Sequence, residues 1–316
     1  MKKLILILFY FIFLVNFSFS QNEPIKSLLE ETNKIELDIL GLTEFAKDKI
    51  KDKETIAKFF YYWVSTNIEY DHKSLEDKKN GIISREEFGK RQETFQVYKN
   101  RKAVCAGYAR LFKLFMDSVD IECNIVKGHI RDERNHYIEL KSDHNFSHAW
   151  NAIKLNNKWK LVDSTWGTSN DKSQSEFYFD IKPEHSIITH YPENSEWQLL
   201  KEPLSLEQFN NSKFIKPFWF FVGFSDIPKL MSDKDFYYFV FTNNPNTEWS
   251  PFLLHSFDNI NFKHIRELTS IKQDGKTYYK FKKLAIAEKT FFKVNLSHLK
   301  DNRMTTYEDI INFKIQ

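Results

Sequence analysis

Two apolar segments separated by a pair of asparagines determine how the middle of this 316-residue chain can fold. The segments are Phe146–Leu155 and Trp159–Thr165, with Asn156 and Asn157 between them. Asparagine tolerates the positive φ angles that a tight hairpin turn requires. The sequence therefore predicts two antiparallel strands joined by a two-residue turn.

The register of this hairpin brings a histidine and an aspartate together. With a two-residue turn, Leu155 faces Lys158 and Trp150 faces Asp163. Because alternate residues of a strand share a face, His148 and Asp163 are predicted to be diagonal neighbours within reach of each other. A three-residue loop would move Asp163 to the opposite face, so the length of the turn tests the prediction.

The segment that follows Val104 predicts an amphipathic helix with a cysteine in its first turn. Its apolar residues recur with helical spacing at Tyr108, Leu111, Phe112 and Phe115. Cys105 would lie where unpaired N–H groups and the helix dipole favour a thiolate. Basic residues just upstream act in the same direction: Lys99, Arg101 and Lys102. Ala106 and Gly107 are small, and we expect them to leave room for a substrate beside the sulfur.

Cys105, His148 and Asp163 form the candidate catalytic site. In thiol catalysis an imidazole takes the thiol proton and later donates one to the leaving group, while a carboxylate orients the ring. Taken singly, each residue has a simpler explanation: a core cysteine, a hydrogen-bonded strand histidine, a turn aspartate. Cys123 lies in a predicted strand and is interpreted as core packing, with a Cys105–Cys123 disulfide as the alternative.

A metal site is the competing interpretation of the histidines in this part of the chain. His136, His144 and His148 are close in sequence. His144 and His148 would share a face only on a helix, whereas the segment is predicted as a loop followed by a strand. No second cysteine or glutamate completes a zinc pattern. We expect neither a metal nor a cofactor.

The segments that carry these three residues resemble the transglutaminase-like superfamily, which has a papain-like fold. The resemblance lies in Ala103–Ala109, Ser147–Asn151 and Trp159–Gly167, with Trp63 and residues 67–71 as an upstream block. It implies that the three residues, in the order cysteine, histidine, aspartate, are a catalytic triad. Ala103 stands where the family usually has glycine.

A further block after the triad resembles the kyphoscoliosis peptidase branch of that superfamily. Its parts are Phe177–Asp180, Pro183-Glu184, Thr189–Pro192 and Trp197–Leu200. Members of the branch carry Ig-like β domains beyond this block. His190 is expected to have a structural role, with a place in the cleft as the alternative.

The oxyanion donors are only partly indicated. The backbone N–H of Cys105 is one candidate. Gln96 and Tyr98 are candidates for a side-chain donor.

The first twenty residues have the anatomy of a secretory signal peptide. Lys2 and Lys3 precede an apolar run from Leu4 to Val15, and small serines follow at Ser18 and Ser20. We expect cleavage near Ser20-Gln21 and export to the periplasm or the medium, with an uncleaved anchor as the alternative. No later segment is long and apolar enough to span a membrane.

The charge balance argues against a nucleic-acid partner. Removing residues 1–20 removes two of the 46 basic residues and none of the 43 acidic ones, which leaves a net charge of +1. A near-neutral chain without a long basic tract is a poor candidate for binding nucleic acid.

The predicted fold class is α+β. Residues 21–200 are interpreted as a transglutaminase-like domain with N-terminal helices and an antiparallel sheet, and residues 72–92 as a loop or short helix within it. Residues 201–316 are interpreted as a β-sandwich domain, Ig-like by the resemblance. Its expected strands are Trp219–Phe224, Phe236–Thr242, Tyr278–Leu284 and Thr290–Leu296.

The site and the resemblance together predict an exported enzyme that forms a thioester on Cys105. Water as the acceptor makes it a peptidase or amidase acting on peptide or protein amide bonds, which is the leading hypothesis. An amine as the acceptor makes it a protein cross-linking transglutaminase. The remaining alternative is a non-catalytic scaffold that binds a peptide in the cleft. In each case the C-terminal β domain is a candidate for docking a protein partner.

Overall fold

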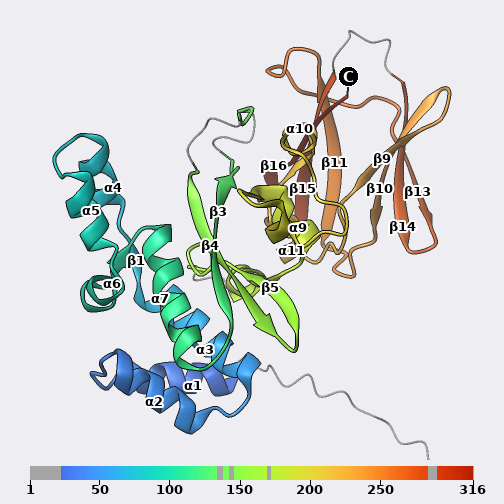
Figure 1. The fold of residues 1–316 in the computed structure, drawn as a ribbon. Coiled ribbons are helices and arrows are strands. Elements are labelled where there is room, and N and C mark those ends of the chain that lie inside the picture. Colours follow the sequence, from blue (N-terminus) through green and yellow to red (C-terminus); the bar gives the residue numbers. More distant parts are fainter. Residues whose placement is uncertain (1–22, 134–137, 142–145, 169–171, 284–289, 316) are drawn as a thin grey trace, which may run out of the picture.

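The computed structural model describes residues 23–133, 138–141, 146–168, 172–283 and 290–315. The expected signal peptide, its cleavage point at Ser20-Gln21, and the histidines His136 and His144 lie outside the described residues. Helices come first, a five-stranded antiparallel sheet follows, and two further sheets complete the chain (Figure 1). Among the described residues, no helix is both long and apolar enough to cross a membrane.

Six helices precede the candidate nucleophile in the described part of the chain. They are α1 (Glu23–Thr32), α2 (Ile39–Lys49), α3 (Lys53–Asn67), α4 (His72–Lys79), α5 (Arg85–Arg91) and α6 (Thr94–Asn100). Asp52 caps the start of α3 by accepting a hydrogen bond from the N–H of Thr55. Most of α3 is buried, because its aromatic residues pack in the core of this half of the molecule. Residues 72–92, for which the sequence predicts a loop or a short helix, form the two helices α4 and α5.

The helix that carries Cys105 packs against the central sheet. This helix, α7 (Cys105–Ser118), lies against β3 and β4 (Figure 1). The sheet has the order β6-β5-β4-β3-β7. Its strands are β3 (Cys123–Ile130), β4 (His148–Leu155), β5 (Lys158–Val162), β6 (Phe179–Ile181) and β7 (His190–Pro192). Two short strands, β1 (Glu69–Tyr70) and β2 (Lys102–Ala103), pair in parallel, and β2 comes directly before α7.

The predicted hairpin register is confirmed. Leu155 pairs with Lys158 across the turn, and the same register continues to Asn151 opposite Val162. Asn156 and Asn157 have φ angles of 50° and 59°. Positive φ at both turn residues is the geometry of a type I′ turn, whose twist matches that of the strands.

A connecting segment leads from the central sheet to the C-terminal strands. It contains the 3₁₀ turn η1 (Ser195–Gln198) and α10 (Leu206–Asn211), whereas α8 (Lys172–Phe177) lies between β5 and β6 and α9 (Pro183–Thr189) lies between β6 and β7. In Figure 1, α9 and α10 lie between the central sheet and the C-terminal strands.

Two antiparallel sheets form the C-terminal part. One has the order β13-β14-β10-β9 and the other β12-β11-β15-β16-β8. Their strands are β8 (Phe214–Ile215), β9 (Lys229–Ser232), β10 (Phe236–Thr242), β11 (Trp249–Ser256), β12 (Lys263–His264), β13 (Thr269–Gln273), β14 (Lys276–Lys282), β15 (Thr290–Lys300) and β16 (Arg303–Ile315). Phe239 and Phe281 of the first sheet share a core with Phe292 and Val294 of the second. The C-terminal part is thus a two-sheet β unit.

One predicted strand is wrong. The run Trp219–Phe224 does not form a strand; its first part belongs to α11 (Phe218–Phe221). Trp219 stacks on Phe224 with ring centroids 3.8 Å apart. Gly223 has a φ of +105°, so the chain turns back there and brings the two rings together. A run of apolar residues has no period that separates a buried turn of helix from a short strand.

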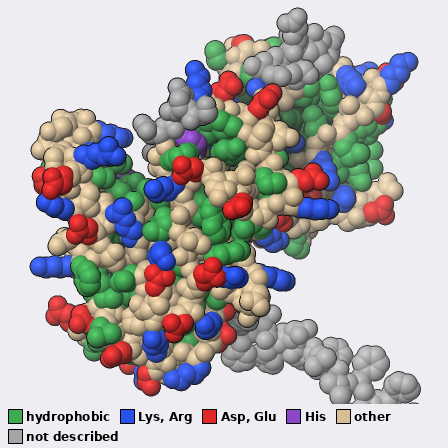
Figure 2. Space-filling view, in the orientation of Figure 1, with side chains coloured by type: hydrophobic (Ala, Val, Ile, Leu, Met, Phe, Trp, Pro, Cys, Tyr) green, Lys and Arg blue, Asp and Glu red, His purple; other side chains and the backbone are tan. Residues whose placement is uncertain are grey.

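Charged side chains of both signs are mixed on the surface. On the face drawn in Figure 2, Lys and Arg are interspersed with Asp and Glu over both halves of the molecule. That face therefore shows no extended field of one sign.

Candidate active site

His148 and Asp163 meet at the end of the hairpin. His148 begins β4, and Asp163 directly follows the last residue of β5. The Nε2 atom of His148 lies 2.6 Å from Oδ2 of Asp163. Both side chains are buried, with 6% of His148 and none of Asp163 exposed. The register therefore brings the predicted pair into direct contact.

The Asp163 carboxylate is held by donors on both of its oxygens. Oδ1 accepts hydrogen bonds from the backbone N–H groups of Thr165 and Trp166, at 2.9 and 3.0 Å. Oδ2 contacts His148 and a second imidazole, that of His190. Burial opposes ionisation of the carboxyl, but the charge and hydrogen bond of His148, with those of His190, hold the pKa of Asp163 well below its usual range. Asp163 is a fixed, buried anion.

Cys105 lies at the first residue of α7 and is half-buried. Val104, the preceding residue, offers no side-chain cap to the helix. Burial opposes ionisation of the Cys105 thiol, but the hydrogen bond and charge of His148 outweigh it and lower the pKa of the thiol. A thiol with a lowered pKa is present as the nucleophilic thiolate at a lower pH.

His148 is the shared partner of the other two residues. Burial alone would lower the pKa of His148. The Asp163 carboxylate and the Cys105 sulfur have the opposite and larger effect, and together they raise the pKa to about 10. The raised pKa of the imidazole and the lowered pKa of the thiol have one cause, which is the stability of an imidazolium–thiolate pair beside Asp163. Because Nε2 is bound to Asp163, it is Nδ1 of His148 that remains for Cys105.

Cys123 behaves as a core residue. It is 3% exposed, and burial raises the pKa of its thiol to about 12. Both cysteines are free thiols, so the alternative of a Cys105–Cys123 disulfide is wrong for this structure.

Gln92 is a neighbour of the nucleophile that sequence reasoning missed. Its Oε1 accepts a hydrogen bond of 2.8 Å from the N–H of Val104. Gln92 is only 2% exposed, so it fixes the backbone immediately before Cys105 from within the core. A polar residue between Arg91 and Glu93 gives no sequence signal of burial.

Gly107 is small for a different reason than predicted. A Cβ atom at this position would lie 2.6 Å from the Cβ of Ala103 and 2.9 Å from both Gln92 Oε1 and Val97 Cγ2. The missing side chain lets α7 pack against α6 and β2. The expectation that Gly107 leaves room for a substrate is therefore wrong.

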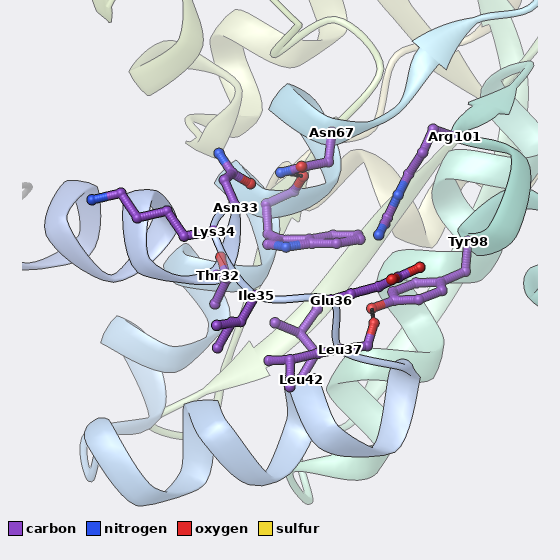
Figure 3. Close-up of a pocket in the computed structure, with 11 residues that line it drawn as sticks. Thr32, Asn33, Lys34, Ile35, Glu36, Leu37, Leu42, Asn67, Tyr98 and Arg101 are labelled. Atoms are coloured by element: carbon purple, nitrogen blue, oxygen red, sulfur yellow. Dashed lines mark hydrogen bonds between the residues drawn. The ribbon is translucent and has the colours of Figure 1, made fainter.

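The structure does not support either predicted side-chain oxyanion donor. Tyr98 lines a separate pocket of about 320 Å³ among the N-terminal helices, and its hydroxyl donates a 2.6 Å hydrogen bond to the carbonyl of Leu37 (Figure 3). Its one donor hydrogen is thus already used. Gln96 is exposed on α6, where its Oε1 faces the amide of Asn100. The N–H groups at the start of α7 stay the candidate donors.

The comparisons with known proteins agree with this geometry. Residues 42–164 match the model of the transglutaminase-like superfamily, a range that includes Cys105, His148 and Asp163. The chain therefore carries a transglutaminase-like domain, of a class associated with thiol-dependent acyl transfer.

Several curated proteins are similar to this chain. Over 187 residues the chain is 33% identical to the kyphoscoliosis peptidases of Mus musculus and of Homo sapiens, an alignment that covers 56% of this chain and 27% of each relative. It is 28% identical over 134 residues to hillarin of Drosophila melanogaster, covering 37% of this chain and 16% of that protein. The chain thus matches only about a quarter of the length of its kyphoscoliosis peptidase relatives. Over the aligned region, its domain is similar to that of the kyphoscoliosis peptidases.

Proposed function

We propose that this protein is an exported, thiol-dependent acyl-transfer enzyme that acts on peptide or protein amide bonds, with Cys105, His148 and Asp163 as its catalytic residues. The observation that carries the proposal is the 2.6 Å contact between His148 and a fully buried Asp163, with Cys105 close enough for the same imidazole to lower the pKa of its thiol. One buried carboxylate, one imidazole and one thiol at a helix start are the parts that thiol catalysis needs.

The steps follow from the protonation states. The Cys105 thiolate attacks the carbonyl carbon of the amide, and N–H groups at the start of α7 stabilise the oxyanion. The C–N bond then breaks, the His148 imidazolium gives its proton to the leaving amine, and a thioester remains on Cys105. Water, losing a proton to His148, attacks the thioester and releases the acid. Asp163 stays ionised throughout and holds the ring.

We propose that the acyl group is transferred to water and not to an amine, because water can reach the thioester without a dedicated binding site for the acceptor. The name of the kyphoscoliosis peptidase relatives favours the same choice. The transglutaminase reaction differs only in the last step, where a primary amine replaces water.

The test uses a peptide p-nitrophenyl ester and the full chain. Attack by Cys105 releases nitrophenolate and leaves the peptidyl group as a thioester, which intact-mass measurement detects and peptide mapping locates. We expect an adduct on Cys105 that decays to free acid, and none with Cys105→Ala. An adduct that turns over only when a primary amine is added would select the transglutaminase reaction. Failure of the wild-type chain to form any adduct would leave the non-catalytic scaffold.

Export is proposed from residues 1–20, with the mature chain starting near Gln21. Expression of the full gene in a Gram-negative host should yield a periplasmic or secreted form that lacks these residues. Intact mass of the fractionated protein checks this, and a full-length chain in the cytosol would contradict it.

The C-terminal part is proposed to be an Ig-like β-sandwich that docks a protein partner. Its two antiparallel sheets with a shared aromatic core support a sandwich. The strand connections that define an Ig fold, and the partner, are part of the proposal.

A further inference from the structure

His190 is the one other titratable side chain in direct contact with Asp163 among the described residues. It is the first residue of β7 and lies opposite Ile130 of β3. β3 in turn pairs with β4, so the pairing β4-β3-β7 places His190 on the sheet that carries His148. The side chain is 1% exposed and packs edge-on against Trp150 and Trp166.

The hydrogen bonds of His190 define its protonation state. Its Nε2 lies 3.0 Å from Oδ2 of Asp163, and its Nδ1 lies 2.8 Å from the hydroxyl of Thr189. An ionised carboxylate only accepts, so Nε2 carries a hydrogen. The Thr189 hydroxyl has a poorer acceptor in the carbonyl of Ser186, at 3.5 Å, and therefore donates to Nδ1. His190 is then a neutral imidazole, in agreement with its pKa, which burial lowers despite the nearby Asp163.

A metal ion does not explain this cluster. His148, Asp163 and His190 are grouped closely enough to suggest metal ligands. However, Oδ2 of Asp163 lies 2.6 Å from one imidazole nitrogen and 3.0 Å from the other. Tetrahedral ligands at zinc distances are separated by roughly 3.4 Å, because each lies ~2.1 Å from the ion. The two distances are those of hydrogen bonds.

Both imidazoles therefore compete for one carboxylate oxygen. We infer that His190 is a positioning residue that donates its Nε2–H to Oδ2 of Asp163 and so limits how strongly this oxygen binds the His148 imidazolium. The inference rests on the proposed function. A hydrogen bond to the charged form of Asp163 draws on the same negative charge that stabilises the imidazolium. His148 must release its proton to the leaving amine, and an imidazole that is too basic is a poor acid.

The charged and titratable groups around Oδ2 come from several elements. Asp163 faces His148 of β4 and His190 of β7, and Cys105 of α7 faces His148. Two tyrosines near Asp163, Tyr61 of α3 and Tyr178, are buried, and burial raises the pKa of each well above its usual value, so they stay neutral.

One further cation lies on the adjoining strand end. Arg131 follows β3, and its guanidinium is bound to backbone carbonyls, those of Ile188, Phe209, Ser212 and Lys213. It does not contact Asp163 in the structure.

Two substitutions separate the hydrogen bond from the ring. His190→Phe keeps a flat ring between Trp150 and Trp166 but removes the donor. His190→Gln keeps an N–H donor but removes the ring. The rate of Cys105 alkylation by iodoacetamide is measured from about pH 4 to about pH 10 in the full chain, and Cys123 is too buried to interfere. In parallel, ¹⁵N spectra of the imidazoles report the tautomer of His190 and the titration of His148.

The expected pH shift is in the direction of higher Cys105 reactivity, which a damaged site would not produce. Without the competing donor, the acid limb of the His190→Phe profile should move to lower pH by about one unit, which is about tenfold more thiolate below the wild-type midpoint. His148 should stay protonated to higher pH. His190→Gln should follow the wild type.

Several results would overturn the inference. Unshifted profiles for both variants, or a loss of reactivity at every pH, would assign His190 to packing. If His190→Phe does not fold, the wild-type spectrum decides, because a charged His190 or an Nδ1–H tautomer contradicts the inference. If wild-type Cys105 is alkylated with the pH dependence of an ordinary thiol, the proposed function is contradicted. The titration of His148 in the ¹⁵N spectra still tests the role of His190 in that case.

Discussion

Replacing His148 with alanine should return Cys105 to the reactivity of an ordinary thiol. The imidazole is what lowers the pKa of this thiol, against the opposing effect of burial. Without it, a thiol at the ordinary pKa of ~8.5 would be only about 0.3% ionised at pH 6, and burial reduces this fraction further. The mutant thiolate is intrinsically more nucleophilic than the wild-type thiolate, because its pKa is higher, and this offsets part of the loss in rate. We expect alkylation by iodoacetamide at pH 6 to slow by on the order of 30-fold.

The control for His148→Ala is the replacement of a histidine that lies outside the candidate site. His264 is exposed on β12 in the C-terminal part, so His264→Ala serves as the matched control and should leave the rate unchanged. Near pH 10 the difference should disappear or reverse, because the mutant thiol is then largely ionised and its thiolate is the more nucleophilic of the two. Equal rates for the two proteins at pH 6 would show that the imidazole does not activate Cys105.

The core of the site could be predicted because its signals are local in sequence. The Asn156-Asn157 turn sets the hairpin register, and the register alone puts His148 beside Asp163. In the same way, the spacing of apolar residues predicts α7 and places Cys105 in its first turn. Neither step needs information from distant parts of the chain.

Other parts of the site depend on contacts that no local pattern contains. His190 reaches Asp163 only because β7 pairs with β3, and these strands are separated by about sixty residues. Gln92 reaches the backbone of Val104 from a short segment between two helices. Such long-range placement follows from the assembled sheet and from core packing.

In the C-terminal part, the sequence predicts some β strands and misses others, and the difference depends on how much of each strand is buried. β10 has an aromatic run interrupted by Val240, and its predicted and observed bounds agree at Phe236–Thr242. β13 is exposed along its whole length and β16 over its first half, so neither shows the apolar alternation that marks a half-buried strand.

Replacing Asp163 with asparagine should abolish catalysis while leaving the fold in place. The asparagine oxygen would accept the two backbone N–H groups that now bind Oδ1, those of Thr165 and Trp166. Its NH₂ group would then face His148 and His190. His148 would have to present an unprotonated Nε2, so its hydrogen would move to Nδ1, the atom that must accept the Cys105 proton. The base would be lost through the wrong tautomer, at a cost of about 10³ to 10⁴ in the acylation rate.

The measurement is the initial rate of nitrophenolate release from the peptide ester, with thermal unfolding as a check on the fold. Asp180→Asn is the matched control, because Asp180 is exposed and its ion pair with Lys160 contributes little to stability. Asp180 also has a φ of +60°, a conformation that asparagine adopts readily. If Asp163→Asn kept most of the wild-type rate, the carboxylate would not set the tautomer of His148. The burial of an anion beside two imidazoles would then need a structural explanation. A folded protein with a rate near that of Cys105→Ala is the outcome that the shared Oδ2 contact requires.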